Sequence, residues 1–341
     1  MTFRLLAITD PGCAVSTRYR ITQFEPYLNQ RQINVETLPW PQLAAKQAIL
    51  LKSVEAADAV LFQRYLPPRR WLRQIRQRAK RLVYDFDDAI IYAESTRGRP
   101  RLLLHRWWRF RAMMRCCDAI SAGNSYLAEL AQRESPQGRV CVVPTTLELE
   151  RYDHERSPTE TAPVVGWIGG RWTLPYLEQL RRPLEQLSGE IAGLTILAIA
   201  DQAPDLGKTR VELVTWAAET EVRDLKRLRI GVAPLPDDVW TLGKCGLRLL
   251  QYLAAGVPAV ASPVGTQAAV IQAGAALRAS SDSDWREALH RVLSDQSLAG
   301  DLTARGQQLV REQFSTSSWA ERVRDLWCGR VESSEPVASA S

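Results

Sequence analysis

Short apolar runs alternate with helical patterns along most of the chain, and no other feature restricts the available folds as strongly. In the first half these runs occupy residues 3–9, 34–38, 59–62, 82–86, 119–121 and 140–143. Strands that alternate with helices at this spacing favour a parallel sheet with helices on both faces. The length of 341 residues is large for one compact core and favours two such domains. We therefore predict an α/β fold with two Rossmann-like, doubly wound domains.

The composition excludes several classes of protein. No run of about 18 apolar residues is present, which excludes a transmembrane helix. The six cysteines lack C-x-x-C spacing and the three histidines lie far apart, so neither a disulfide framework nor a zinc site is expected. We predict a cytoplasmic enzyme with reduced thiols and without a metal centre.

The segment from 234 to 265 contains the strongest candidate for an anion site. A turn-rich loop carries Lys244 and leads through Gly246 into a helical pattern that stops at Gly256. The first N–H groups of a helix lack partners within it, and the helix dipole is positive at that end. Lys244 adds a full positive charge, so we predict a phosphate group as the ligand.

The run GLRLLQYLAAGVPAVAS at 246–262, followed by Pro263, Val264 and Gly265, resembles the donor-binding segment of retaining glycosyltransferases of family 4, which have the GT-B fold. Further similarity lies in the motifs GWIGGR at 166–171, YDFDDA at 84–89, GNSYLAELA at 123–131 and VVPTTL at 142–147. One departure is clear, because the family usually has two Glu residues where this chain has Gly243 and Gln251.

The resemblance implies an enzyme that transfers a sugar from a nucleotide-sugar donor to a glycan or lipid-linked acceptor with retention of configuration. Such an enzyme would act in the synthesis of cell-envelope polysaccharide or glycoconjugates. The nucleotide sugar is a substrate, and the resemblance implies no cofactor and no required metal. The missing pair of Glu residues leaves an alternative, a protein of the same fold that binds nucleotide or glycan without transfer.

The resemblance also implies a set of donor-binding residues in the second half. Arg171 and Lys244 would neutralise the departing diphosphate, which gives both a catalytic role. Gln251 would hydrogen-bond the ribose, more weakly than the usual Glu. Trp216 would flank the base, or it is an ordinary core residue. The other donor-binding candidates are Gly169, Gly170, Gly246, Leu247 and Gly265.

The first half supplies candidates for acceptor binding. A helix predicted to begin with Ser16 as its cap has Arg18 and Arg20 in its first turn, where arginine opposes the helix dipole. The loop before this helix faces the interdomain cleft in the resembled family. Gly12, Ser16, Arg18 and Arg20 are therefore acceptor candidates, and an exposed helix start is the alternative.

Three carboxylates, Asp85, Asp87 and Asp88, lie at the end of one predicted strand in the motif VYDFDD. Clustered carboxylates repel one another unless they are protonated, hydrogen-bonded or paired with cations. They could bind a divalent ion, act as a base or bind sugar hydroxyls, and a helix cap with salt bridges to nearby arginines is the alternative. The resemblance favours acceptor binding over metal, with Asp87 as an acceptor ligand and Asp88 as a catalytic residue.

Positive charge is concentrated in the first half. Residues 1–157 carry 25 Lys and Arg against 16 Asp and Glu, whereas the remainder carries 19 against 22. From Arg97 to Arg115, seven arginines lie among Leu, Trp, Phe and Met without an acid. This pattern fits an anionic membrane surface, a packed helix with a solvated basic face, or single-stranded nucleic acid. Membrane binding fits a transferase with a lipid-linked acceptor, the packed helix remains an alternative, and no recognition motif supports nucleic acid.

These patterns predict four regions. Residues 1–157 form an acceptor-binding domain and residues 158–314 a nucleotide-sugar-binding domain. A terminal helix at 315–330 crosses back to the first domain, and residues 331–341 form a disordered tail. The enzyme is expected in the cytoplasm, attached peripherally to the cytoplasmic face of the inner membrane.

Overall fold

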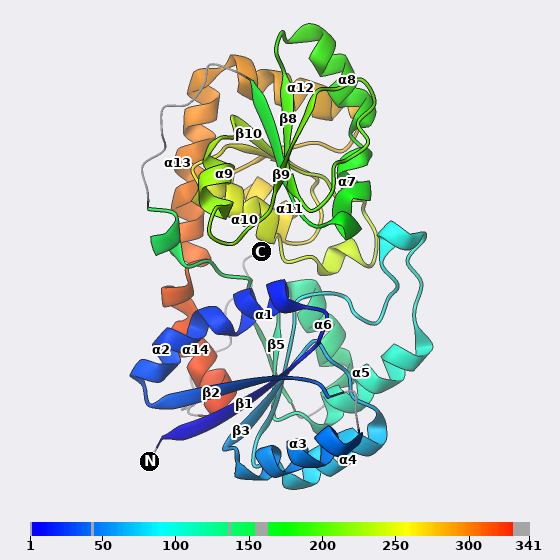
Figure 1. Ribbon diagram of the computed structural model, residues 1–341, viewed down its shortest axis with the longest axis vertical. Helices are drawn as coiled ribbons and strands as arrows, with labels where there is room; N and C mark the ends of the chain where they lie inside the picture. The colour runs from blue at the N-terminus through cyan, green and yellow to red at the C-terminus, as the bar shows by residue number, and fades with distance from the viewer. Residues whose placement is uncertain (1, 42–43, 136–137, 154–162, 330–341) are drawn as a thin grey trace. The chain divides into compact units, whose positions relative to one another are not determined.

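The computed structural model describes residues 2–41, 44–135, 138–153 and 163–329, so the predicted tail at 331–341 lies outside the described residues. The chain divides into two compact units (Figure 1). Unit 1 contains the chain up to Asp87, then Leu104–Val143, and the C-terminal part from Ser317. Unit 2 contains Asp88–Leu103 and Pro144–Thr316. The segment 88–103 therefore interrupts unit 1 in the sequence and belongs to unit 2.

Unit 1 is built on a sheet of six parallel strands in the order β2-β1-β3-β4-β5-β6. The first strand pairs with β2 on one side and with β3 on the other, so the strand order reverses between β1 and β3. Ligands of such sheets bind beyond the carboxyl ends of the strands at this switch point. The strands are β1 (Phe3–Thr9), β2 (Ile33–Pro39), β3 (Ala59–Gln63), β4 (Leu82–Phe86), β5 (Ala119–Ala122) and β6 (Arg139–Val142).

Helices cover both faces of this sheet. Leu61 of β3 shares a core with Trp327 of the last helix. On the opposite face, Phe86 of β4 packs edge-on against Phe110, with ring centroids 5.5 Å apart. The helices of unit 1 are α1 (Ala14–Arg20), α2 (Glu25–Gln30), α3 (Ala44–Ala56), α4 (Arg69–Arg78), α5 (Leu104–Cys116), α6 (Ser125–Glu134) and α14 (Thr316–Cys328).

The single helix predicted from Ser16 onward is two short helices in the structure. The first begins at Ala14, and the second carries Pro26 in its first turn. Proline lacks an N–H group and fits only the first turn of a helix, which explains the break. The prediction that Ser16 caps the helix is wrong, because Ser16 lies inside α1. Arg18 and Arg20 consequently lie in the last turn, where the dipole favours a cation.

Unit 2 is built on a second sheet of six parallel strands, in the order β12-β11-β10-β7-β8-β9. Here β7, the first strand of the unit, lies between β8 and β10, so the switch point lies between β7 and β10. The strands are β7 (Val164–Ile168), β8 (Thr195–Ala200), β9 (Val211–Thr215), β10 (Ile230–Ala233), β11 (Ala259–Ala261) and β12 (Leu277–Arg278).

The core of unit 2 joins this sheet to its helices. Trp167 of β7 is fully buried in one cluster with Leu177, Leu184, Trp285 and Leu302 from four helices. The helices are α7 (Leu174–Glu178), α8 (Arg181–Glu190), α9 (Glu221–Lys226), α10 (Leu247–Ala254), α11 (Thr266–Gln272), α12 (Asp282–Ser294) and α13 (Gln296–Gln313). The predicted α/β fold with two doubly wound parallel sheets is confirmed.

Candidate active site

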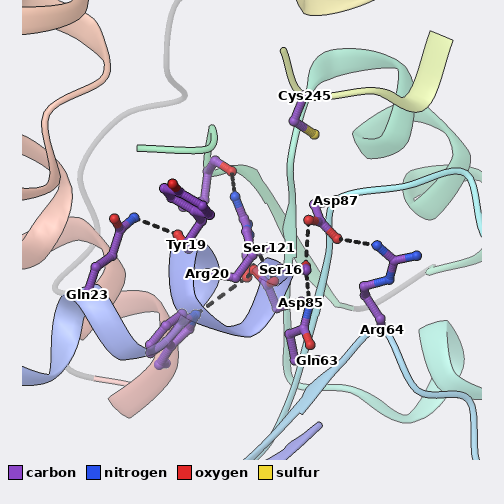
Figure 2. Close-up of polar contacts among 12 residues, drawn as sticks. Ser16, Tyr19, Arg20, Gln23, Gln63, Arg64, Asp85, Asp87, Ser121 and Cys245 are labelled. Carbon is purple, nitrogen blue, oxygen red and sulfur yellow. Dashed lines mark hydrogen bonds and ion pairs between the residues drawn. The ribbon is translucent and has the colours of Figure 1, made fainter. Parts of the chain in front are cut away.

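A connected group of polar side chains lies at the switch point of unit 1 (Figure 2). The Ser16 hydroxyl donates to Asp87 Oδ2 at 2.6 Å and accepts from Gln63 Nε2 at 2.7 Å. Arg64 forms an ion pair with Asp87 Oδ1 at 3.4 Å. These residues come from α1, from the end of β3 and from the end of β4, so the fold brings together Ser16 and Asp87, two of the predicted acceptor-binding residues.

Arg64, which the sequence did not single out, has an unusual backbone. Its φ of 60° lies in the left-handed region, which is uncommon for residues other than glycine. Two hydrogen bonds hold it there: its N–H donates to Asp85 O at 2.8 Å, and the Tyr84 hydroxyl donates to its carbonyl at 2.9 Å. Backbone strain of this kind is enriched at functional sites, so Arg64 joins the candidates.

The predicted acceptor residue Arg20 lies in the interior of unit 1 instead. Its guanidinium meets Asp85 through Nε at 3.0 Å and Nη2 at 2.5 Å, and Nη1 donates to Val143 O at 2.6 Å. Ser121 donates a further hydrogen bond to Asp85 at 2.7 Å (Figure 2). Burial raises the pKa of the Asp85 carboxyl, and the Arg20 charge opposes that effect. Arg20 is 1% exposed, so its contacts are those of a structural ion pair.

The two remaining acceptor candidates are placed less distinctively. Gly12 is exposed in the turn after β1, where its N–H donates to Asp10 Oδ1 at 3.2 Å. The Arg18 guanidinium lies 5.1 Å from the ring centroid of Tyr19. Gly12 thus lies in a surface turn and Arg18 beside an aromatic ring.

In unit 2 the residues predicted to bind an anion lie where the loop after β10 enters α10. Gly246 is the N-cap of α10 and has a left-handed φ of 73°. Lys244 Nζ pairs with Asp88 Oδ1 at 2.8 Å and lies 4.7 Å from the ring centroid of Trp240. Asp88 is mostly buried, and as part of the segment 88–103 it lies in the same unit as Lys244, whereas the preceding residue Asp87 belongs to unit 1. The structure therefore joins two of the three predicted catalytic residues.

The same segment explains the glycine where the resembled family has Glu. A Cβ atom at Gly243 would lie 2.6 Å from the backbone nitrogen of Ala89 and 2.7 Å from its Cβ. Real Cβ atoms do not approach other heavy atoms this closely, so no side chain fits at 243. A carboxylate reaches this loop from Asp88 instead.

The other predicted donor residues near α10 are mostly packed. Gln251, at the second position where the family has Glu, is 4% exposed within α10, whereas Leu247 is half-buried. Gly265 caps α11 with a φ of 55°, and a Cβ atom there would lie 3.0 Å from Lys244 O. Gly265 thus allows the loop after β11 to pack against the loop that carries Lys244.

The third predicted catalytic residue, Arg171, already has a carboxylate partner. Its Nε lies 3.0 Å from Asp201 Oδ2, and its backbone N–H donates to Asp201 Oδ1 at 2.7 Å. The side chain is 59% exposed and lies over Trp172, which Arg97 covers as well. The predicted base neighbour Trp216 follows β9 at the sheet edge, and its Nε1 donates to Glu221 at 2.8 Å.

A cation that the sequence did not reveal, Arg248, lies at the switch point of unit 2. It occupies the first turn of α10, and its Nε donates to the carbonyl of Ile168, the last residue of β7. The guanidinium lies 4.5 Å from the ring centroid of Trp167, and Nη2 donates to Thr173 Oγ1 at 3.3 Å. The sequence signal was weak, because an arginine next to an apolar helical stripe usually faces solvent.

One face of α5 carries the surface features predicted between Arg97 and Arg115. Phe110 and Met113 are buried beneath the helix, whereas Leu104 and Trp108 are 63% and 46% exposed. The Arg111 guanidinium lies 5.7 Å from the Trp108 ring centroid. None of the described helices combines the length and apolar character that a membrane span requires.

Comparisons with known proteins connect this geometry to a fold. No protein-family model and no curated protein matches the chain. Sucrose-phosphate synthase from Thermosynechococcus elongatus has a similar solved structure, with a TM-score of 0.75 and 15% identity over 96% of this chain and 99% of that one. A glycosyltransferase from Rickettsia africae has a TM-score of 0.74 and 9% identity over 98% and 100%.

The structure of Anabaena Alr3699/HepE in complex with UDP and glucose is also similar, with a TM-score of 0.68 and 12% identity over 95% of this chain and 98% of that one. Identities this low show the fold alone. Together with the two parallel sheets and their switch points, these likenesses show that the chain has the GT-B fold.

Proposed function

We propose that this protein is a retaining glycosyltransferase that moves a sugar from a nucleoside-diphosphate sugar to a glycan or lipid-linked acceptor. The observation that carries the proposal is the junction of Lys244, Gly246 and α10 at the carboxyl end of β10. A helix start with an adjacent ammonium group suits a phosphate-bearing ligand. The similar HepE structures with UDP and with UDP-glucose support a uridine nucleotide as the first donor to test.

The chemistry expected of this site is stabilisation of the leaving group. Negative charge develops on the diphosphate as its bond to the sugar breaks, and groups that bind this charge lower the barrier. Lys244 and the first N–H groups of α10 would provide that stabilisation. Asp88, 2.8 Å from Lys244, would hold the ammonium group in position. The acceptor hydroxyl would attack from the side that the diphosphate leaves, which requires no protein nucleophile.

The acceptor would bind in unit 1. Ser16, Gln63, Arg64 and Asp87 form a hydrogen-bonded group in which the cation is already paired. Such a group suits neutral hydroxyls better than a second anion. A lipid-linked acceptor also agrees with the exposed Leu104 and Trp108 beside arginines on α5, since basic residues with apolar neighbours bind the headgroup region of anionic membranes. We propose peripheral attachment through this face, in cell-envelope polysaccharide or glycoconjugate synthesis.

A test of this function combines ligand binding with turnover. Wild-type protein is screened by thermal shift with UDP, GDP, ADP and their sugars, because a ligand of the native state raises its stability. Sugar transfer and donor hydrolysis are then compared in Lys244→Ala and in Lys208→Ala, which removes an exposed lysine of unit 2. We expect Lys244→Ala to lower turnover by about 10²- to 10³-fold, as for the loss of one charge-stabilising donor.

The outcomes separate the two candidate functions. Unchanged turnover in Lys244→Ala would contradict the assignment of this lysine. If the wild type binds nucleotide but shows neither transfer nor hydrolysis, the second candidate function is favoured, a binding protein without catalytic activity. The motive for this candidate is the absence of carboxylates at positions 243 and 251, which are Gly243 and Gln251 here. A wild type that is stabilised by none of these nucleotides would contradict both the transferase and the nucleotide-binding protein.

A further inference from the structure

Arg248 has only neutral neighbours among the described residues. Its donors meet a backbone carbonyl, the Thr173 hydroxyl and the ring of Trp167, and no described carboxylate lies within 4.0 Å of its guanidinium. Burial lowers the pKa of Arg248, and the only side chains that oppose this effect are the tyrosines Tyr252 and Tyr176. Arginine nevertheless stays charged in proteins, so a positive charge remains here without a counter-charge.

This arrangement is unfavourable for the protein alone. Removal of a cation from water is costly unless an opposite charge replaces the lost solvation. Stacking of the guanidinium on the Trp167 ring offsets part of this cost. The buried Arg20 of unit 1 differs, because its charge is balanced by Asp85, which accepts hydrogen bonds from two of its nitrogens. An anionic ligand would supply for Arg248 what Asp85 supplies for Arg20.

The position of Arg248 matches the place where this sheet type binds ligands. Ile168 ends β7, and α10 follows β10, so Arg248 links the two strands that flank the switch point. The first turn of α10 contributes its unpaired N–H groups at the same place. Lys244 lies two residues before the N-cap Gly246, so the loop that carries this second cation leads into the same helix start.

The glycines after β7 agree with this arrangement. A Cβ atom at Gly169 would lie 2.6 Å from Arg248 Nη2 and 2.6 Å from the Trp167 ring, so only glycine admits the stacked guanidinium. A Cβ atom at Gly170 would meet no atom within 4 Å, so the backbone is open on that side. Arg171, the next residue, instead forms an ion pair with Asp201.

We propose that Arg248, rather than Arg171, provides the guanidinium that binds the diphosphate of the donor, with Trp167 as the platform that orients it. The inference rests on the proposed function and assigns a residue within that site. A planar guanidinium can offer two parallel donors to phosphate oxygens, which a lysine cannot do.

The test measures binding rather than turnover. Isothermal titration calorimetry gives the dissociation constants of UDP and of uridine for three variants. Arg248→Met keeps an unbranched apolar side chain over Trp167, and Arg171→Met tests the rival residue. Arg182→Met, at an exposed arginine of α8, is the control. Loss of hydrogen bonds from a charged donor should weaken UDP binding about 10- to 100-fold in Arg248→Met. Uridine binding should not change, because the nucleoside lacks the diphosphate.

Two further variants guard against a misfolded protein. Gly169→Ala should displace the guanidinium and produce the same selective loss of UDP affinity. Arg248→Lys should recover part of it, because the charge returns without the fork. A large loss in Arg171→Met with full affinity in Arg248→Met would overturn the assignment, and so would equal losses for UDP and uridine. Failure of the wild type to bind any nucleoside diphosphate would instead refute the proposed function.

Discussion

Both units have polar side chains at the switch point of a parallel sheet, but the arginines there differ in whether a carboxylate neutralises them. In unit 1, Arg20 is paired with Asp85 and Arg64 with Asp87. In unit 2, Arg248 meets a carbonyl, a hydroxyl and an aromatic ring. A neutralised group is suited to uncharged hydroxyls, whereas an uncompensated cation is suited to an anion. The uncompensated charge of Arg248 therefore supports the proposed diphosphate site in unit 2, and the neutralised group supports the proposed acceptor site in unit 1.

The motif YDFDDA at 84–89 supplies carboxylates to both units. Asp85 binds Arg20 in the core of unit 1, Asp87 binds Ser16 at its edge, and Asp88 binds Lys244 in unit 2. Salt bridges to cations, the alternative to a ligand role, are thus found for all three carboxylates. A partner in the protein does not exclude a ligand role for Asp87 or Asp88, since both partners are themselves candidate site residues.

The largest effect should follow from breaking the compensation in unit 1. Asp85→Asn leaves the buried Arg20 charge without a counter-charge, and removal of one partner of such a pair costs about 3 kcal/mol or more. Hydrogen exchange followed by mass spectrometry should show lower protection in the strands of unit 1. Arg248→Met should change the free energy of exchange in unit 2 by less than about 1 kcal/mol, because it removes a charge that no carboxylate balances. Equal losses in the two units would contradict the contrast.

A smaller effect is expected at the edge of the same sheet. The Asp87–Arg64 pair is half-buried and 3.4 Å long, so Asp87→Asn should destabilise unit 1 by only about 1 kcal/mol. The same exchange experiment measures it. UDP affinity should stay at the wild-type value, because the proposed function gives Asp87 a role in binding the acceptor and not the donor. A weakened UDP complex would show that the assignment of one ligand to each unit is wrong.

The smallest effect concerns the outer surface, where the sequence is basic in the first half and slightly acidic in the second. Cosedimentation with vesicles of anionic and zwitterionic lipid should show preference for the anionic ones. Trp108→Ala should weaken binding about fivefold, since partial burial of a large aromatic contributes on the order of 1 kcal/mol. Trp172→Ala removes a tryptophan of unit 2 that is 63% exposed and should have no effect. Equal binding to both vesicle types would refute the membrane surface.

The strands were predictable because their signal is local. The apolar run at 82–86 coincides with β4, and the run at 119–121 differs from β5 by one residue. Asn124 caps α6, where its side chain accepts from the Leu127 N–H at 2.9 Å, as is typical of asparagine before a helix. The break between α1 and α2 was missed, although Pro26 marks it.

The site was predictable only in part. Lys244 and Gly246 could be found because a loop, a lysine and a helix start are adjacent in the sequence. Arg248 could not be found in this way, because its significance is the absence of a carboxylate around it. No pattern along one chain reports which residues are missing from a neighbourhood in space.

The sequence by itself determined two parallel-sheet domains and a helix start suited to phosphate, since the apolar period, the glycines and the caps act over a few residues. Only the tertiary structure decided which charges are compensated and why Gly243 replaces a glutamate. Arg20 and Asp85 lie 65 residues apart in the chain, and Ala89 fills the space beside Gly243. Ion pairing and steric room depend on distance in space, which only the packed fold sets.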